Sequence, residues 1–192
     1  TEADKDGATD LSAEGVTSLR EANATNRTMI GSVFAEYTFD NGLAIGVDHI
    51  PGSADVSDKS LSRTDVTADA KEVQGQDDGA RTANAEVENH MTYYVNVPIH
   101  AGTYALLGYV EMDVNTTETN LTTTSYGNTS VDGYKVGAGY RGTMGSNLYY
   151  KLEGAHTEFD TLNISNTETV KGNKISADLD VTQMTFAVGY AF

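Results

Sequence analysis

The chain has 192 residues, enough for one domain, with no cysteine and a formal net charge of −16. This acidic balance argues against nucleic acid as a partner, because phosphate binding needs clustered lysine and arginine. Without cysteine there is neither a disulfide framework nor a thiolate metal site. No run approaches about 18 consecutive apolar residues, so we expect no transmembrane helix. Because an initiator methionine and a signal peptide are both missing, we read the chain as mature or trimmed.

Residues 1–27 are acidic, rich in serine, threonine and asparagine, and show no alternation of apolar and polar positions. Such a composition is typical of solvated connections rather than of packed elements. We therefore expect an external segment or loop here, with at most a short helix over residues 10–23.

From residue 28 onward, seven segments alternate with the period of two that is typical of β-strands. They cover residues 28–39, 43–50, 87–99, 104–114, 131–141, 147–159 and 177–192. Short connections at 40–42, 100–102 and 142–146 alternate with long ones at 51–86, 115–130 and 160–176. The first short connection is Asp40-Asn41-Gly42, and Asn-Gly between alternating runs is a strong hairpin signal. In antiparallel strands all short turns then fall on one rim, which predicts an all-β, antiparallel, up-and-down barrel in one domain.

The last segment has the clearest alternation. Its apolar face consists of Met184, Phe186, Val188, Tyr190 and Phe192, and the residues between them are small or polar. By the same alternation we assign Tyr104, Leu106, Val110, Met112 and Val114 of the fourth segment to the outward face. A soluble up-and-down barrel would instead carry a polar outer face, so the pattern favours a barrel surrounded by lipid.

A chain that ends on an alternating apolar strand with a terminal aromatic residue resembles small bacterial outer-membrane β-barrels of the OmpA, OmpX and opacity type. This resemblance implies a transmembrane barrel in the outer membrane of a Gram-negative bacterium, surrounded by lipid and lipopolysaccharide. It also implies that the assembly machinery for barrels reads the C-terminal strand and that Phe186, Val188, Tyr190 and Phe192 face lipid. An aromatic girdle at the periplasmic interface would comprise Tyr37, Phe39, Tyr104, Tyr140, Tyr150, Tyr190 and Phe192.

The number of strands needs an explanation, because bacterial single-chain barrels have an even number, from about eight upward. Seven visible strands predict an eighth that precedes Thr1 or comes from a separate N-terminal strand or another barrel chain. It would close the gap between segments 28–39 and 177–192. An odd-stranded closed barrel with one parallel pair is the alternative.

The inward faces of the segments carry most of the polar side chains that would fill the barrel. This predicted lumen network comprises Glu36, Asp48, Glu88, His90, Tyr94, Tyr109, Glu111, Asp113, Lys135, Arg141, Lys151, Glu153 and Gln183. An eight-stranded interior is just wide enough to be filled by side chains, and buried charges must be paired. The sequence therefore predicts a charge-plugged interior rather than an open pore.

The strand register suggests which of these charges meet. We expect Lys135 to lie between Glu111 and Glu153, with Lys151 beside the same cluster. Arg141 should lie near the short-turn rim, at the level of the inward acid of the first segment. Six inward acids against three inward bases keep open a narrow, cation-preferring channel as the alternative.

The predicted function is that of a non-enzymatic surface protein. A structural barrel would display long acidic loops for adhesion, assembly, or attachment of a phage or another extracellular protein, with 51–86 as the main contact loop. A porin-like channel is the second reading and a lipid-modifying enzyme the third, for which His156 and Glu158 are the nearest candidates. We expect no cofactor or metal, although acidic loop pairs such as Asp77-Asp78 have the oxygen donors that Ca²⁺ prefers.

Overall fold

Every described element of this protein is a β-strand. The computed structural model describes residues 2–4, 18–20, 27–55, 61–65, 79–119, 127–165 and 174–192, and no helix occurs among them. The strands are β1 (Glu2–Asp4), β2 (Ser18–Arg20), β3 (Val33–Thr38), β4 (Ala44–Ile50), β5 (Ala54–Asp55), β6 (Leu61–Asp65), β7 (Gly79–His100), β8 (Thr103–Thr119), β9 (Thr129–Thr143), β10 (Leu148–Phe159), β11 (Leu162–Ser165), β12 (Lys174–Ala177) and β13 (Asp180–Tyr190).

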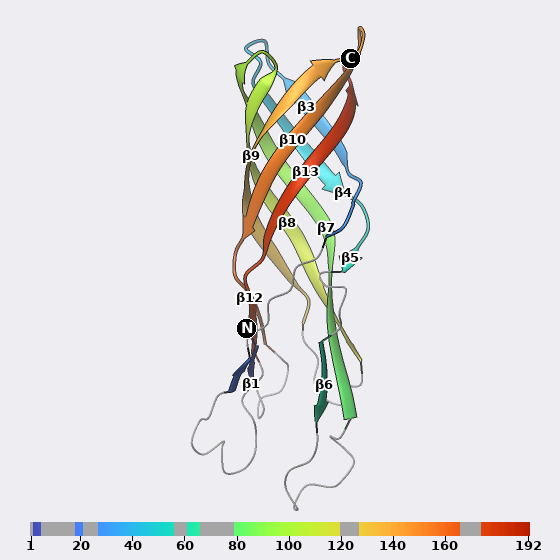
Figure 1. Cartoon of the computed structure of the whole chain (residues 1–192), viewed down its shortest axis with the longest axis vertical. Helices are drawn as coiled ribbons and strands as arrows, with labels where there is room; N and C mark the ends of the chain where they lie inside the picture. Colours follow the sequence, from blue (N-terminus) through green and yellow to red (C-terminus); the bar gives the residue numbers. More distant parts are fainter. Residues whose placement is uncertain are drawn as a thin grey trace, which may run out of the picture.

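The main sheet is an antiparallel meander that curls into a half-barrel (Figure 1). Its order is β13-β10-β9-β8-β7-β4-β3, so each long strand pairs with its neighbours in sequence, and short β5 and β6 pair with β7. The predicted all-β, antiparallel, up-and-down order is thereby confirmed. β3 and β13 form the two edges of this sheet and run parallel to each other, because they stand at the two ends of a seven-strand antiparallel path.

The three predicted short turns lie together at one end of the sheet, with the C terminus (Figure 1). In the β3–β4 turn, the amide of Phe39 donates to the carbonyl of Leu43 at 2.8 Å, and Gly42 has a φ of 83°. Gly102 has the same φ in the β7–β8 turn, and residues with a Cβ rarely adopt this backbone conformation. These turns define what we call the turn rim, and the opposite end is the loop rim.

Toward the loop rim the structure has more strands than expected. β7 and β8 remain paired as far as Thr82 and Thr119, well into the expected long connections, which also contain β5, β6, β11 and β12. Residues 2–4 and 18–20, expected in a loop with at most a short helix, form β1 and β2. They belong to a second, four-stranded sheet of order β11-β12-β1-β2. No local pattern in residues 1–27 indicated that these residues pair with β12, which lies far away in the sequence.

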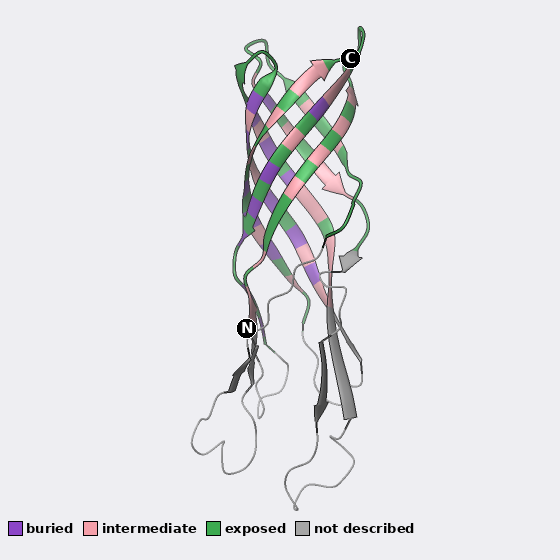
Figure 2. Ribbon diagram, viewed as in Figure 1, coloured by how far each residue is buried: buried purple, intermediate pink, exposed green. Residues whose placement is uncertain are grey.

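The main sheet has an inside-out distribution of side chains (Figure 2). We call the side that faces the interior of the curl the concave face, and the other side the convex face. On β9, Lys135 is 4% exposed on the concave face, whereas the convex neighbours Tyr134 and Val136 are 67% and 53% exposed. A soluble domain normally shows the opposite arrangement.

Candidate functional site

The concave face carries a buried ion network centred on Glu36 of β3. Its side chain is 1% exposed and forms ion pairs with Arg141 of β9 and with Lys151 of β10, whose Nζ lies 3.3 Å from Oε2. The hydroxyl of Tyr94 and the side-chain amide of Asn96 each donate to the same carboxylate at 3.1 Å. The expected proximity of Arg141 and Glu36 is thus an ion pair that crosses the interior from β9 to β3.

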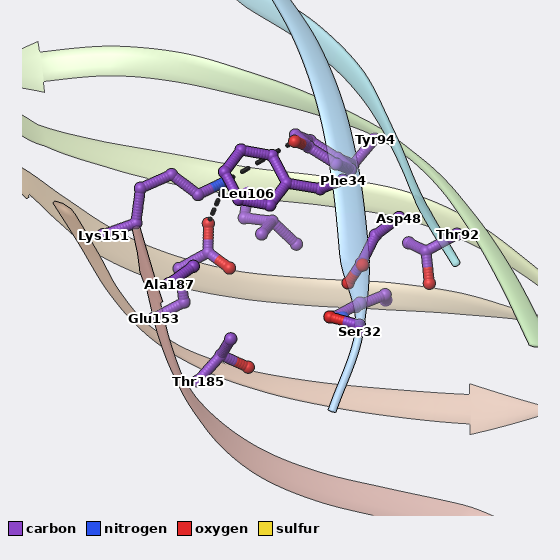
Figure 3. Close-up of a pocket in the computed structure, with 11 residues that line it drawn as sticks. Ser32, Phe34, Asp48, Thr92, Tyr94, Leu106, Lys151, Glu153, Thr185 and Ala187 are labelled. Atoms are coloured by element: carbon purple, nitrogen blue, oxygen red, sulfur yellow. Dashed lines mark hydrogen bonds and ion pairs between the residues drawn. The ribbon is translucent and has the colours of Figure 1, made fainter. Parts of the chain in front are cut away.

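A second carboxylate extends the network along β10. Lys151 Nζ lies 3.0 Å from Glu153 Oε1, and the hydroxyl of Tyr104 donates to the same oxygen at 2.6 Å. Figure 3 shows Lys151 reaching toward Tyr94 on the opposite wall and toward Glu153 of its own strand. Lys151 is 3% exposed, so its charge is compensated by two carboxylates within the protein rather than by solvent.

Three of the inward tyrosines stand directly opposite a glycine on the next strand. The pairs are Gly46 with Tyr94, Gly139 with Tyr104, and Gly189 with Tyr149. In each pair the ring covers the glycine, and a Cβ built on the glycine would collide with ring atoms. These glycines therefore make room for the tyrosines, two of which donate to the carboxylates of the network.

We expect the substitution Gly139→Val to destabilise the protein by about 1–3 kcal/mol, because overpacking forces side chains away from their preferred positions. A Cβ at residue 139 would lie 2.5 Å from Tyr104 Cζ, whereas a Cβ at Gly154 meets nothing within 4 Å. Gly154→Val on the convex face is the matched control and should leave stability nearly unchanged. Denaturant unfolding of both variants measures the difference, and equal losses would contradict the packing argument.

A small cavity of about 20 Å³ lies in the middle of the concave face (Figure 3). Residues from both edge strands and from the opposite wall line it, among them Phe34 of β3, Thr185 of β13 and Lys135 of β9. The buried Asp48 Oδ1 and Thr92 Oγ1 have no hydrogen-bond partner among the described residues. The cavity has room for about one water molecule, which such atoms can bind.

Toward the loop rim the concave face becomes apolar. Its cluster contains Val110, Met112, Val114, Val131, Phe159, Leu162 and Ile164, all less than 9% exposed. It joins β8, β9 and β10 of the main sheet to β11 of the second sheet. The interior is therefore polar near the turn rim and filled by hydrocarbon side chains near the loop rim.

This cluster corrects the predicted face of β8. We had assigned Tyr104, Leu106, Val110, Met112 and Val114 to the outward face, but they are buried on the concave face. The girdle assignment of Tyr104 was consequently wrong. Both faces of β8 near the turn rim carry large apolar residues, so alternation alone did not fix the direction.

The same reversal removes Tyr109, Glu111 and Asp113 from the predicted lumen network. They lie on the convex face, so the expected contact of Lys135 with Glu111 was wrong. The hydroxyl of Tyr109 donates to Asp132 at 3.0 Å. Near the loop rim, Asn89 and Ser130 donate to Asp113 and hold the pKa of its carboxyl below the usual range.

Glu88 also lies on the convex face, for a different reason. The register of β7 against β8 shifts between Glu88 and Met91, where Asn89 has a φ of 52°. This β-bulge reverses the parity of β7, so that Glu88 shares its face with Asp113 while Thr92 and Tyr94 point inward. His90, at the bulge, remains on the concave side, where its Nδ1 is buried.

The charges on the described concave face are balanced. Three acids, Glu36, Asp48 and Glu153, accompany three bases, Lys135, Arg141 and Lys151. Gln183, the remaining predicted lumen residue, donates to Thr185 within β13 at 3.2 Å. The predicted excess of six acids over three bases is therefore wrong. The cation-preferring channel was suggested by that excess, so it loses its support.

The convex face carries two groups of aromatic side chains. Near the turn rim, Tyr37 packs on Phe39, Tyr140 on Tyr150, and Tyr190 on Phe192, with ring centroids 4.9, 6.0 and 5.2 Å apart. Farther toward the loop rim, Tyr93, Tyr109 and Tyr134 stand opposite one another on β7, β8 and β9. Sequence reasoning missed this second row because it had placed Tyr109 inside.

No described residue between these two groups puts an Asp, Glu, Lys or Arg side chain on the convex face of β9, β10 or β13. Leu148 and Glu158 are ten positions apart on β10, which is roughly 33 Å along a strand. With a strand tilt of about 40°, this gives a height of about 25 Å for the uncharged band. Phe186 and Val188, expected to face lipid, lie in it and are 66% and 49% exposed.

The residues considered for catalysis lie at the loop-side end of this band. His156 Nδ1 lies 3.0 Å from Thr182 Oγ1, and Glu158 shares the convex face with them. Among the described residues, no group of three or more His, Cys, Asp or Glu side chains is arranged to hold a metal ion. Asp77-Asp78 and most of the 51–86 connection lie outside the described side chains.

In the described part of the chain, no helix is long and apolar enough to cross a membrane. Comparisons with protein-family models, with curated proteins and with solved structures found no match for this chain. What the protein does must therefore be argued from the two faces of its main sheet.

Proposed function

We propose that this protein is a non-enzymatic barrel of a Gram-negative outer membrane whose loop-rim strands and loops bind partners at the cell surface. The observation that carries the proposal is the inside-out sheet: ion pairs are buried on the concave face, while Phe186, Leu152 and Val136 are about half exposed or more on the convex face. A continuous face of exposed apolar side chains is unfavourable in water and favourable in lipid. The 25 Å band matches the apolar height of such barrels.

Closure of the barrel requires one more strand in this proposal. β3 and β13 are parallel and unpaired with each other among the described residues, so a single strand antiparallel to both would satisfy both edges. It would also cover the cavity that Phe34 and Thr185 line from the two sides. Within a bilayer, unpaired backbone groups at an edge are costly, which is why spanning sheets are closed.

A closed interior fits this arrangement better than a channel does. The balanced ion network fills the turn-rim half, and the apolar cluster around Val110 and Phe159 fills the loop-rim half. The apolar half interrupts any polar path along the interior, and the cavity beside the ion network holds only about 20 Å³. In this proposal the strands within the band act as a rigid support for the strand ends and loops at the loop rim.

The surface that remains for partners is the loop-rim end. β7 and β8 extend past the band to Thr82 and Thr119, and β5 and β6 pair along β7 there. Adhesion, assembly and phage attachment are the partner classes that suit such a projecting, acidic end. Outer-membrane lipid and lipopolysaccharide would surround the band, and the assembly machinery would engage β13.

Conductance of the refolded protein in a planar lipid bilayer tests the proposal. We expect no steady current, because side chains fill both halves of the interior. Heat-modifiable migration on gels, which reports the folded barrel, must show that the silent protein is folded in the membrane. Steady cation-selective current would replace the proposal with a channel, and a folded monomer in buffer without detergent would refute the membrane assignment.

A further inference from the structure

The second sheet continues the wall of the main sheet across the gap between β3 and β13. β11 follows β10 and β12 leads into β13, and the amide of Phe159 donates to the carbonyl of Leu179 at 3.1 Å where the two ladders join. β2 is the described strand that precedes β3. The order β11-β12-β1-β2 therefore matches β10-β13-gap-β3, with β1 in the line of the gap. Figure 1 shows β12 and the N terminus together at the loop-rim end of β13.

The register of β1 gives the direction of a chain that would enter this gap. Glu2 stands opposite Ile175 of β12 and opposite Arg20 of β2, and β1 is antiparallel to both strands. Each step backward from Glu2 therefore advances along β12 toward β13 and along β2 toward β3. Tyr190, the end of β13, lies 15 positions after Ile175. About 15 residues before Glu2 would thus reach the turn rim, antiparallel to both edges.

The edge strands lack the cover that the other long strands have on the concave face. Lys151 of β10 is 3% exposed, whereas Thr185 and Ala187 of the neighbouring β13 are only half-buried. On the other side of the gap, Phe34 of β3 is half-buried as well. These residues all line the small cavity of the concave face. A further strand would cover them and would pair with the backbone groups of both edges that face the gap.

The interior beneath the gap restricts what such a strand can carry. The ring of Phe34 lies edge-on to Tyr149 of β10 with centroids 6.3 Å apart, and Lys151 Nζ lies 4.7 Å from the centre of the Phe34 ring. Side chains of β3 and β10 therefore already meet there, which leaves room only for small inward residues such as Gly, Ala, Ser or Thr. They must be uncharged, because the acids and bases of the described concave face are balanced. The outward residues must be apolar, like Val33 and Val188 of the flanking strands.

We propose that the segment of this protein immediately before Thr1 fills the gap, as a strand of about 15 residues that runs from the turn rim into β1. Small, uncharged side chains alternate with apolar ones along it. The inference rests on the barrel proposed above and names the source of its closing strand. The same chain is the favoured source because β1 already continues the line of the gap, so closure is intramolecular and costs no association entropy.

The natural protein and a shortened form of it test this inference. The intact mass of the protein from native outer membranes should exceed the 20.5 kDa of residues 1–192 by at least about 15 residues, all before Thr1. A form that begins at Thr1 should lose most of the heat-modifiable folded fraction in vesicles. A synthetic peptide of the missing segment, added during refolding, should restore part of it. The matched control peptide has the same residues with inward and outward positions exchanged, and it should restore nothing.

Disulfide cross-linking tests the register of β1 independently, because the chain has no cysteine of its own. Ala3→Cys with Lys174→Cys joins direct partners and should cross-link in the folded protein. Ala3→Cys with Ser165→Cys is the matched control, since Ser165 stands opposite Lys174 on the far side of β12. Two strand spacings of about 4.8 Å put the control pair beyond the roughly 7 Å that a disulfide can bridge between Cα atoms.

Three results would overturn the inference and leave the membrane proposal intact. The first is a natural mass of 20.5 kDa together with a folded barrel, which would assign the closing strand to another chain or a second copy. The second is equal folding of the natural protein and the form that begins at Thr1, and the third is equal cross-linking of the two cysteine pairs. Failure of the natural protein to enter any bilayer would instead overturn the membrane proposal, and this inference with it.

Discussion

Replacing Glu36 by glutamine is expected to reduce the free energy of unfolding by about 3 kcal/mol, as is typical when one partner of a buried ion pair is removed. Glutamine has nearly the same shape, so the change removes the charge and little else. Arg141 and Lys151 would then share a site that keeps only the neighbouring Glu153 carboxylate. Lys151, which is 3% exposed, cannot move its charge into bulk solvent without unpacking the wall, whereas Arg141 is 25% exposed and keeps some contact with water.

The measurement is the denaturant dependence of the heat-modifiable, folded fraction in lipid vesicles. Glu111→Gln is the control, because Glu111 is an exposed acid on the opposite face of the sheet from the network, and it should change stability by no more than about 0.5 kcal/mol. Adding Lys151→Met to Glu36→Gln should recover part of the loss, because it removes a base that has lost its acid. Equal stability of Glu36→Gln and the wild-type protein would mean that water reaches and screens the network.

Alternation predicted the faces of five long strands throughout, failed on the fourth, and failed in the third on the loop-rim side of the bulge at Asn89. In the last segment, Phe186 and Val188 alternate with Thr185 and Ala187, so only one face can be the apolar one. In β8, Leu106 and Leu107 are adjacent, and only Leu106 is buried. What decides between them is β9, whose Gly137 and Gly139 leave space on the concave face for large neighbours from β8. That information lies in another strand.

The ion network was predictable only where alternation within single strands determines which side chains face inward. The Arg141–Glu36 pair follows from faces and levels that single strands determine. The hydrogen bond from Tyr104 to Glu153 was missed because Tyr104 had been given the wrong face, although inward glycines on the facing strand were a usable signal. The displacement of Glu88 depends on the bulge at Asn89, and no residue pattern around Asn89 announces a change of register. The sequence also did not predict that β7 and β8 stay paired beyond residues 87 and 114, where β5 and β6 pair along β7.

Replacing Leu107 by arginine is expected to destabilise the protein in lipid vesicles by about 1–3 kcal/mol, because an arginine on the lipid face costs about 2–4 kcal/mol at the bilayer midplane and less toward the interfaces. Leu107 is 54% exposed on the convex face of β8, between Val95 and Val136 on the neighbouring strands. If this face meets lipid, as we propose, the guanidinium has no protein partner there and must disturb the bilayer to reach water. In an aqueous setting the same exposed substitution would cost almost nothing.

Glu111→Arg is the matched control, because it puts the same side chain on the same face of the same strand, four positions nearer the loop rim. At that depth an arginine should cost no more than about 1 kcal/mol. The pair also tests the direction of β8, since the originally predicted face would place residue 107 inside the barrel and residue 110 in lipid. Denaturant unfolding in vesicles measures both variants. Equal small effects would remove the lipid contact from the proposal, and a large effect for Glu111→Arg alone would show that the band has been placed at the wrong height.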